Sequence, residues 1–335
     1  MRALVVGCGS IGRRHTENLR RLGVDEILVY DPDRSRASAA ANEYGVQAVE
    51  TLEAGYDRRR QIALICTPTS LHLELARQAL EHGCHVFVEK PLSHQLDGTE
   101  SLIAAAHERG RVLMVGYNLR FHSCVCRMHD WLEEKRIGHV ASARLHAGSY
   151  LPARHPWEDY RRGYGARKNL GGGVILDAIH EIDYALWLFG MPQSVNCVAG
   201  KFSNLEIDVE DVAEILLDYP DRKVVSIHLD YLDRPPQRYA EIVGDAGVIR
   251  SNLIKGTAQL FDGEKQEWTR FKGRGGQNET YAWELRHFLD CVTNLSVPVV
   301  DGEAACRSLA VAEAAKRSAC ERRSVTLAPY RAATA

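Results

Sequence analysis

The sequence of 335 residues predicts an α/β protein with two domains. Its length is about twice that of a typical single domain. From residue 1 to about 120, short apolar runs alternate with amphipathic stretches, which is typical of a parallel sheet covered by helices. Beyond residue 120, apolar and polar residues alternate within several runs, which predicts a mostly antiparallel sheet. We therefore expect one domain over residues 1–120 and a second over residues 121–335.

In the first domain, each predicted strand is a short apolar run and each predicted helix has apolar residues at helical spacing. The strands are expected at residues 3–6, 26–30, 46–49, 62–66, 85–88 and 112–115. The helices are expected at residues 11–22, 35–44, 71–82 and 96–109. The glycines at 23, 45, 83 and 110 follow these four helices, as C-terminal caps do.

In the second domain, a helix is expected at residues 122–135, before the first alternating run. The alternating runs cover residues 140–146, 212–218, 224–229 and 239–243. Two late helices are expected at residues 280–294 and 302–321. We find no internal repeat.

Composition excludes several classes of function. The 42 basic and 44 acidic residues give a formal net charge of -2, so no global field attracts nucleic acid or an anionic membrane. The N-terminus lacks the layout of a secretory signal, and no apolar run approaches the roughly 20 residues of a membrane span. The nine cysteines are scattered and odd in number, which favours reduced thiols in a cytoplasmic protein. Cys124 and Cys126 are too close for a usual zinc knuckle, so we predict no metal site.

A glycine-rich turn follows the first strand and opens the first helix. It reads Gly7-Cys8-Gly9-Ser10-Ile11-Gly12, and the pattern G-x-G-x-x-G at this place lets a pyrophosphate approach free backbone amides. Asp31 ends the second strand about 20 residues later, where a carboxylate can bind the adenosine ribose. A structural glycine turn is the alternative. The charge of Asp31 favours NAD over NADP, although the nearby Arg34 and Arg36 could accept a 2′-phosphate.

Four further motifs occur in a specific order along the chain. They are Thr67-Pro68 with His72, then Glu89-Lys90-Pro91, then Gly116-Tyr117-Asn118-Leu119-Arg120-Phe121, and then Gly171-Gly172-Gly173-Val174-Ile175-Leu176-Asp177-Ala178-Ile179-His180. With the glycine turn, they make nearly the whole chain resemble the Gfo/Idh/MocA family, named for glucose-fructose oxidoreductase and inositol dehydrogenase.

The resemblance implies a Rossmann domain followed by an α/β domain with a large open sheet. That sheet would cover the nicotinamide and mediate a homodimer or homotetramer, and the last helix would pack back on the first domain. The implied reaction is hydride transfer between nicotinamide and a carbinol or keto carbon of a sugar, cyclitol or sugar nucleotide. Thr67, Pro68, Glu89 and Lys90 would then join Gly7, Gly9, Ser10, Ile11, Gly12 and Asp31 in binding the cofactor.

Lys90 is the first candidate catalytic residue. It ends the fifth strand, and ligands of open α/β sheets bind at the carboxyl ends of strands. The positive nicotinamide ring of the oxidised cofactor would destabilise its ammonium and lower its pKa toward a useful acid/base range. The alternative is a surface lysine paired with Glu89.

His180 and Asp177 are the other candidate catalytic residues. They are three residues apart, so on one helix they would share a face. His180 could exchange a proton with the substrate hydroxyl, and Asp177 could orient it or contact the substrate. The alternative is a core histidine capped by Asp183 or Glu181. In the inositol-dehydrogenase branch the aspartate and the histidine are usually four residues apart, whereas here they are three apart. The role of His180 therefore transfers more directly than that of Asp177. His72 either lines the cofactor site or caps the helix that follows it.

A basic segment, residues 154–168, precedes the glycine loop and carries five arginines and lysines against two acidic residues. Arginine forks and aromatic faces bind phosphates, carboxylates and sugar rings, so an anionic substrate is plausible. We take Arg161 and Arg167 as candidate substrate ligands, with Tyr117, Asn118 and Arg120 after the sixth strand. A solvated loop or an oligomer contact is the alternative.

Two other functions fit the same motifs. One is a nicotinamide-dependent glycosidase or lyase, in which transient oxidation permits elimination. The other is a non-catalytic NAD-binding regulator, which the pairing of Lys90 with His180 disfavours.

Overall fold

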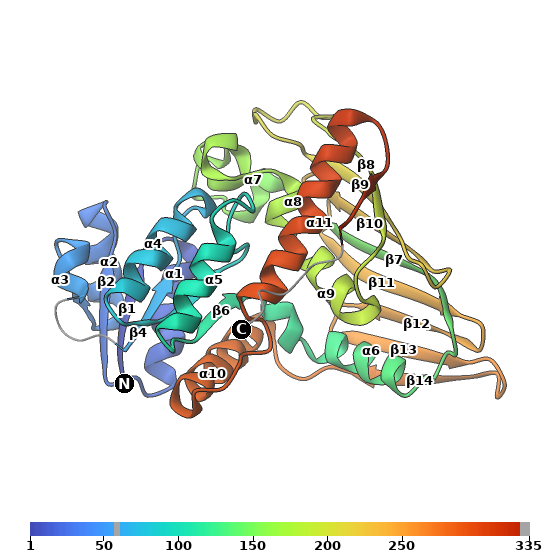
Figure 1. Cartoon of the computed structure of the whole chain (residues 1–335), viewed down its shortest axis with the longest axis horizontal. Helices are drawn as coiled ribbons and strands as arrows, with labels where there is room; N and C mark the ends of the chain where they lie inside the picture. The colour runs from blue at the N-terminus through green and yellow to red at the C-terminus, as the bar shows by residue number, and fades with distance from the viewer. Residues whose placement is uncertain (57–60, 329–335) are drawn as a thin grey trace. The chain divides into compact units, whose positions relative to one another are not determined.

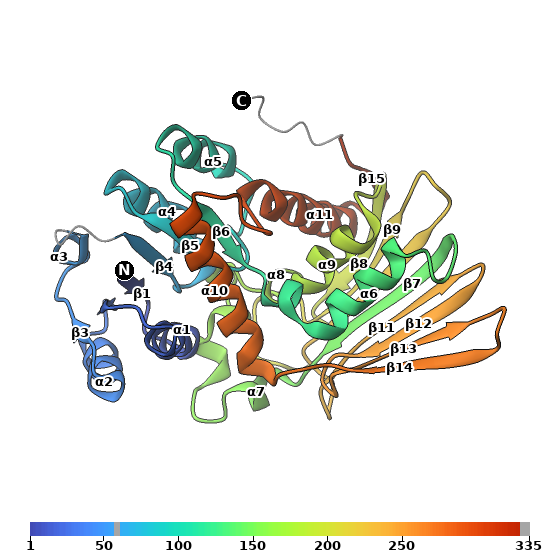
Figure 2. The same cartoon turned by 90° about the horizontal axis from the view of Figure 1, so that it is seen from below.

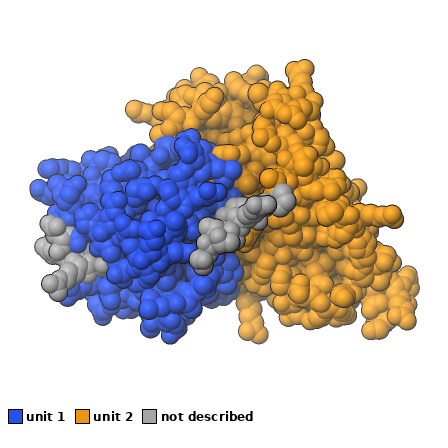
Figure 3. Space-filling model, viewed as in Figure 1, with its two compact units in different colours: residues 1–118, 277–306, 332–335 blue, residues 119–276, 307–331 orange. Residues whose placement is uncertain are grey.

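The computed structural model describes residues 1–56 and 61–328, which form two compact units (Figure 3). Unit 1 contains Met1–Asn118 together with Gln277–Cys306. Unit 2 contains Leu119–Gly276 and residues 307–328. The segment 277–306, which the sequence analysis assigned to the second domain, therefore groups with the first. The predicted packing of the last helix on the first domain stays a prediction.

Unit 1 contains a parallel sheet with the strand order β3-β2-β1-β4-β5-β6. Its strands are β1 (Arg2–Val6), β2 (Glu26–Tyr30), β3 (Gln47–Ala48), β4 (Ile62–Ile65), β5 (His85–Glu89) and β6 (Leu113–Gly116). After β1, the chain adds β2 and β3 on one side of that strand. It then returns to place β4 on the other side of β1 and adds β5 and β6 beyond it. Ligands of such sheets bind at the carboxyl ends of the strands where this reversal occurs. The predicted Rossmann sheet is confirmed.

The helices of unit 1 cover both faces of this sheet (Figures 1 and 2). They are α1 (Ser10–Arg21), α2 (Arg34–Tyr44), α3 (Leu52–Tyr56), α4 (His72–Glu81), α5 (Thr99–Glu108) and α10 (Gln277–Asn294). Five of them, all but α3, lie within three residues of the predicted bounds. The glycines at 23, 45, 83 and 110 all have positive φ, which confirms that they cap these helices.

Helix α10 belongs to unit 1 because its apolar side chains complete that core. Leu285 and Phe288 are fully buried. The ring of Phe288 packs edge-on against Phe87 of β5, with centroids 5.6 Å apart. Tyr281 packs in the same way against His15 of α1, at 5.9 Å. Sequence periodicity marks the helix but does not say which sheet its apolar face covers.

Unit 2 contains a sheet with the order β14-β13-β12-β11-β7-β10-β9-β8-β15. The strands are β7 (Val140–Gly148), β8 (Ser194–Gly200), β9 (Val212–Asp218), β10 (Val224–Asp230), β11 (Gln237–Gly244), β12 (Gly247–Asn252), β13 (Thr257–Asp262), β14 (Glu267–Lys272) and β15 (Val325–Thr326). Neighbours are antiparallel except β7 and β10, which are parallel. The predicted mostly antiparallel sheet is confirmed, although no strand was predicted at β8, β12, β13, β14 or β15.

The helices of unit 2 lie on one face of its sheet (Figure 2). They are α6 (Ser123–Glu133), α7 (Leu151–Arg154), α8 (Val174–Asp177), α9 (His180–Phe189) and α11 (Gly302–Glu321), of which the residues from Arg307 onward belong to this unit. Ala213, Ile215 and Leu217 of β9 point to the buried face. Val198 and Leu216 are exposed on the other face, over which no helix of the described residues lies. None of the described helices is long and apolar enough to cross a membrane.

Candidate functional site

Close packing around the glycine turn explains two of its glycines and leaves the third open. Gly7 has φ of +98°, and a Cβ there would lie 2.5 Å from the carbonyl oxygen of Cys66. A Cβ on Gly12 would overlap the carbonyl oxygen of Gly7. A Cβ on Gly9 would meet no heavy atom within 4 Å. Gly9 is therefore free of steric demands from the protein itself, which fits the close approach of a pyrophosphate at the start of α1.

Asp31 connects the end of β2 to this turn. Its Oδ2 accepts a hydrogen bond from the backbone amide of Cys8 at 2.8 Å, and its Oδ1 accepts one from the amide of Asp33 at 2.9 Å. The residue is buried, with 9% of its surface exposed. The two amides hold the carboxylate in one orientation at the place predicted for ribose recognition. Burial, followed by the charge of Asp31, raises the pKa of the Cys8 thiol to about 12, so Cys8 is a neutral part of the turn.

The ends of β4 and β5 are joined by His72. Its Nδ1 lies 2.8 Å from the carbonyl oxygen of Pro91, and its Nε2 lies 2.9 Å from that of Thr67. Burial lowers the pKa of this imidazole. Its ring nitrogens contact carbonyl groups and no helical amide, so the idea that His72 caps its helix is wrong. It fixes the two loops that carry the predicted residues Thr67, Pro68 and Lys90.

Glu89 is buried and positions the backbone at Lys90. Its Oε1 lies 2.6 Å from Nε2 of His15, which is fully buried in α1. Its Oε2 accepts a hydrogen bond from the backbone amide of Lys90 at 3.1 Å. The Glu89 carboxylate thus links the first helix of the turn to the end of β5. The predicted cofactor residue Glu89 contacts these protein groups, and a direct contact with the cofactor stays a prediction.

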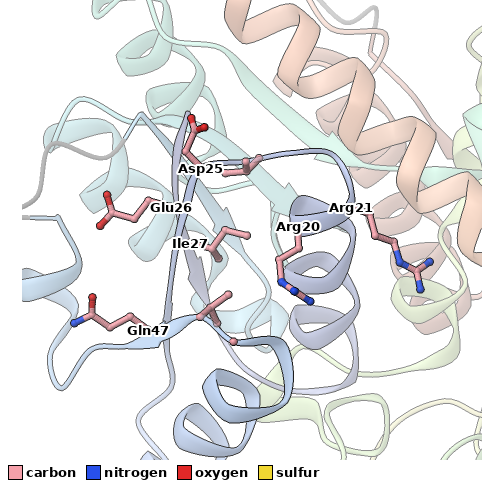
Figure 4. A pocket seen from close by; sticks show the side chains of 9 residues that line it. Arg20, Arg21, Asp25, Glu26, Ile27 and Gln47 are labelled. Atoms are coloured by element: carbon pink, nitrogen blue, oxygen red, sulfur yellow. The ribbon is translucent and has the colours of Figure 1, made fainter.

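A surface pocket of unit 1 lies at the amino ends of the strands, opposite to the ends that carry the glycine turn and Lys90 (Figure 4). Its lining includes Arg20 and Arg21 near the end of α1, Glu26 at the start of β2 and Gln47 at the start of β3. Ligands of open α/β sheets bind at the carboxyl ends of strands, and this pocket faces the amino ends. It is therefore separate from the candidate dinucleotide site.

In unit 2, Asp177 and His180 lie in two different helices. Asp177 ends α8 and His180 begins α9, because Ala178 leaves helical geometry with φ of -98° and ψ of 29°. The expectation that they share one helical face is wrong for this reason. The Asp177 carboxylate pairs with Nη1 of Arg154 and accepts a hydrogen bond from the Tyr164 hydroxyl. It is therefore held by the segment that precedes the glycine loop.

Arg154 is the centre of this cluster, and sequence reasoning did not single it out. Its Nε donates to Oγ of Ser149 at 2.7 Å, and its guanidinium lies 4.8 Å from the ring centroid of Tyr231. Its place in the basic segment was a signal, but the partner Asp177 becomes apparent only in the folded chain. Ser149 after β7, Tyr231 after β10 and Asp177 of α8 thus meet around one guanidinium.

His180 is buried at the start of α9, with 6% of its surface exposed. Both acidic residues that were considered as its caps are engaged by arginines. Glu181 lies 2.9 Å from Nε of Arg238, and Asp183 lies 2.6 Å from Nε of Arg120. The proton-handling role of His180 and its alternative as a capped core histidine both stay predictions.

The residues after β6 make structural contacts. Arg120 also donates from Nη2 to Oδ1 of Asp183 at 3.0 Å, and its guanidinium lies 4.9 Å from the Trp187 ring centroid. Asn118 donates to Oγ1 of Thr280 at 2.8 Å. Tyr117 is fully buried. Substrate binding by these three residues stays a prediction. It is least favoured for Arg120, because Asp183 already occupies its guanidinium.

Arg161 and Arg167 lie in the exposed part of the basic segment. Arg161 pairs with Asp159 at 2.8 Å and with Glu206 at 3.1 Å. Arg167 lies 3.6 Å from a carboxylate oxygen of Asp208. Such exposed pairs contribute little to stability, so an anionic ligand could displace them at small cost.

Two family profiles cover most of the chain. Residues 1–117 match the profile described as the oxidoreductase family with an NAD-binding Rossmann fold, and residues 130–327 match the C-terminal α/β domain of the same family. The chain belongs to the Gfo/Idh/MocA family. The resemblance noted in the sequence is thereby confirmed, and the protein is an NAD-dependent oxidoreductase of this family.

Relatives of this Gfo/Idh/MocA protein include two inositol dehydrogenases. The myo-inositol 2-dehydrogenase of Thermotoga maritima is 29% identical over 98% of each chain. The scyllo-inositol 2-dehydrogenase (NAD(+)) of Bacillus subtilis is 27% identical over 95% of this chain and 94% of its own. Among solved structures, GenD2 from gentamicin A biosynthesis, in complex with NAD, superposes with a TM-score of 0.85 at 26% identity, over 98% of this chain and 97% of that one.

Proposed function

We propose that the protein oxidises or reduces one carbinol or keto carbon of a sugar, a cyclitol or a sugar nucleotide with NAD. The observation that carries the proposal is the arrangement in unit 1, where the open glycine turn, the oriented Asp31 and the end of β5 with Lys90 occur on one parallel sheet. The names of the two inositol dehydrogenase relatives support the substrate class.

The residues of this chain supply the proton chemistry. NAD, when bound, would supply the hydride acceptor, and the chain would have to accept the hydroxyl proton. We assign that proton to Nζ of Lys90, whose backbone amide is fixed by Glu89. A cationic nicotinamide close to Lys90 would destabilise its ammonium and make the amine a proton acceptor. In the reverse direction the ammonium returns the proton to the alkoxide.

His180 is assigned as a second proton-handling group, and Asp177 as its supporting carboxylate. The pairing of Asp177 with Arg154 and Tyr164 holds its carboxylate in a fixed position. Asp177 therefore acts through the loop that it holds, and its replacement should change KM as well as kcat. His180 contributes through its imidazole, which can both accept and donate a proton.

Kinetics of two variants test these assignments. Positioned acid/base groups contribute about 10² to 10⁴ in rate, so Lys90→Met should lower kcat by at least that factor while NAD affinity stays nearly unchanged. His180→Ala should also lower kcat and alter the pH profile. The matched control is Lys201→Met, which removes an exposed lysine of unit 2.

The assay is steady-state and single-turnover kinetics on folded variants of known NAD affinity, with polyols, sugar acids and sugar nucleotides as substrates. A Lys90→Met protein that keeps most of its single-turnover rate would remove lysine from the mechanism. Turnover of NAD measured by near-ultraviolet absorbance separates this function from a glycosidase, a lyase or a regulator, none of which an observation favours. A preference for sugar acids that Arg161→Ala abolishes would assign the basic segment to an anionic group.

A further inference from the structure

Two histidines face each other across the parallel strands of the unit 2 sheet. In the pairing of β7 with β10, His146 lies opposite His228, and Gly148 lies opposite Asp230. Side chains alternate between the two faces of a sheet, so these four positions lie on one face. The same row continues to Tyr239 of β11, opposite His146, and to Glu214 of β9, opposite His228. The register of four strands thus places two imidazoles beside carboxylates.

The polar atoms of this cluster lie close together. Nε2 of His146 is 2.7 Å from Oδ2 of Asp233 and 4.0 Å from Oδ2 of Asp230. Nε2 of His228 is 3.0 Å from the same oxygen of Asp230. The two imidazole rings are stacked with centroids 4.6 Å apart. One ligand atom each of His146, His228 and Asp230 falls within 4.8 Å of the others.

The backbone is shaped to bring the two aspartates to this place. A Cβ at position 148 would overlap the Oδ2 atoms of both Asp230 and Asp233, so only glycine lets them approach. Oδ1 of Asp230 accepts hydrogen bonds from the amides of Leu232 and Asp233, at 2.6 and 2.7 Å. These bonds leave Oδ2 of Asp230 directed at the histidines, and only 5% of its side chain is exposed.

Glu214 acts on the far side of His228. Its Oε1 lies 2.6 Å from Nδ1 of His228. Histidines that bind metals typically donate their other ring nitrogen to a carboxylate, which fixes the tautomer and the ring orientation. This contact therefore leaves Nε2 of His228 as the nitrogen that can bind a cation.

We propose that His146, His228, Asp230 and Asp233 form a binding site for one divalent transition-metal ion of the zinc class. Two imidazole nitrogens and two carboxylate oxygens are a usual ligand set for zinc. Ligand atoms about 2.0–2.1 Å from a tetrahedral zinc lie roughly 3.3 Å from one another. The ligand separations of 2.7, 3.0 and 4.0 Å bracket that value, so small side-chain rotations would complete the site.

Charge also favours a cation here. Asp230, Asp233 and Glu214 place three carboxylates around two imidazoles. A divalent ion would compensate part of this negative charge. Stacking of His146 on Tyr239, with centroids 4.7 Å apart, limits the movement of one ligand.

The site would have a structural role. It joins the carboxyl ends of β7 and β10, and β7 leads directly into Ser149, which accepts a hydrogen bond from Arg154. A bound ion would fix these strand ends and the start of the segment that holds Asp177. The prediction of no metal site rested on Cys124 and Cys126 alone, and no short spacing along the chain marks this cluster. The two histidines are 82 residues apart in the chain and meet through strand register.

Zinc titration of the metal-depleted full-length protein tests the proposal, with a chromophoric chelator as competitor. We expect one Zn²⁺ per chain and a rise of Tm that increases with the Zn²⁺ concentration. Asp233→Asn and His146→Gln should each weaken binding at least tenfold. Glu214→Gln, which changes a group outside the ligand set, should weaken it about 10- to 100-fold. The matched control is His139→Ala, which removes an exposed histidine of the same unit and should leave zinc affinity unchanged.

Electron paramagnetic resonance of the wild-type protein loaded with one Cu²⁺ gives a readout that needs no variant to fold. Hyperfine coupling to two imidazole nitrogens is expected. The site would be overturned by a Cu²⁺ spectrum without coupling to any imidazole nitrogen. It would also be overturned if wild type and both ligand variants bound zinc with equal affinity, or if His139→Ala abolished zinc binding.

Discussion

Substitutions at Gly9 and Gly12 of the glycine turn should separate effects on NAD affinity from effects on the free energy of unfolding. An alanine at either position adds a single methyl group. At Gly12 that methyl would overlap the carbonyl oxygen of Gly7, a backbone atom that cannot move without the turn. At Gly9 it would meet no protein atom within 4 Å, and the backbone there has φ of -70° and ψ of -171°, which alanine adopts freely.

The two substitutions should therefore have opposite effects. Gly12→Ala should lower the free energy of unfolding by about 1–3 kcal/mol, the usual cost of overpacking. Gly9→Ala should leave it unchanged or raise it by about 0.4–1 kcal/mol, because alanine restricts the unfolded chain. The Gly9 methyl would occupy the space that a pyrophosphate needs. Losing one charge-assisted hydrogen bond costs about 1.5–3 kcal/mol, or about a 10- to 100-fold loss of NAD affinity.

Urea denaturation gives the free energy of unfolding, and titration of NAD against protein fluorescence gives the affinity, both at fixed salt and pH. The reasoning is refuted if Gly9→Ala binds NAD as the wild type does. It is equally refuted if Gly9→Ala destabilises the protein as much as Gly12→Ala, because the turn would then be closed around Gly9 in the absence of ligand.

Two further predictions concern cofactor choice and pH. Asp31→Ser should narrow the preference for NAD over NADP, since the carboxylate repels a 2′-phosphate, and equal selectivity in both proteins would contradict this role. Burial lowers the pKa of His72 below its unfolded value of about 6.5, so the unfolded chain binds the proton first and stability is lost as pH falls below about 6.5. His72→Asn should reduce that loss between pH 7.5 and 5.5 in urea titrations, and unchanged pH dependence would exclude His72 as a contributor.

Sequence determined the first unit well because its signals are local. The alternation of apolar runs and helical stretches located the strands and helices of the parallel sheet. The spacing of the glycine turn from Asp31 predicted the dinucleotide site, and the structure shows the carboxylate of Asp31 fixed by the amide of Cys8. Each of these features depends on residues that lie close along the chain or on a fold with few topologies.

Sequence located less of the second unit. Strands β12, β13 and β14 carry weaker alternation, and β14 is almost wholly exposed, so its sequence has no apolar pattern to read. The break between Asp177 and His180 also escaped prediction. Helical periodicity assumes a continuous helix, whereas the chain turns at Ala178 between α8 and α9.

What sequence determined by itself is the family and the cofactor class, because these follow from residue type and spacing along the chain; Lys90 and His180 stay its predicted acid/base residues. Only the tertiary structure decided their partners. Arg154 pairs with Asp177, Arg120 pairs with Asp183, and His146 stacks on His228, in each case because the fold brings distant segments together. The physical reason is that strand register and helix packing are fixed by the burial of whole faces. The residues next to a side chain in the sequence do not specify which distant side chain it will contact once those faces are buried.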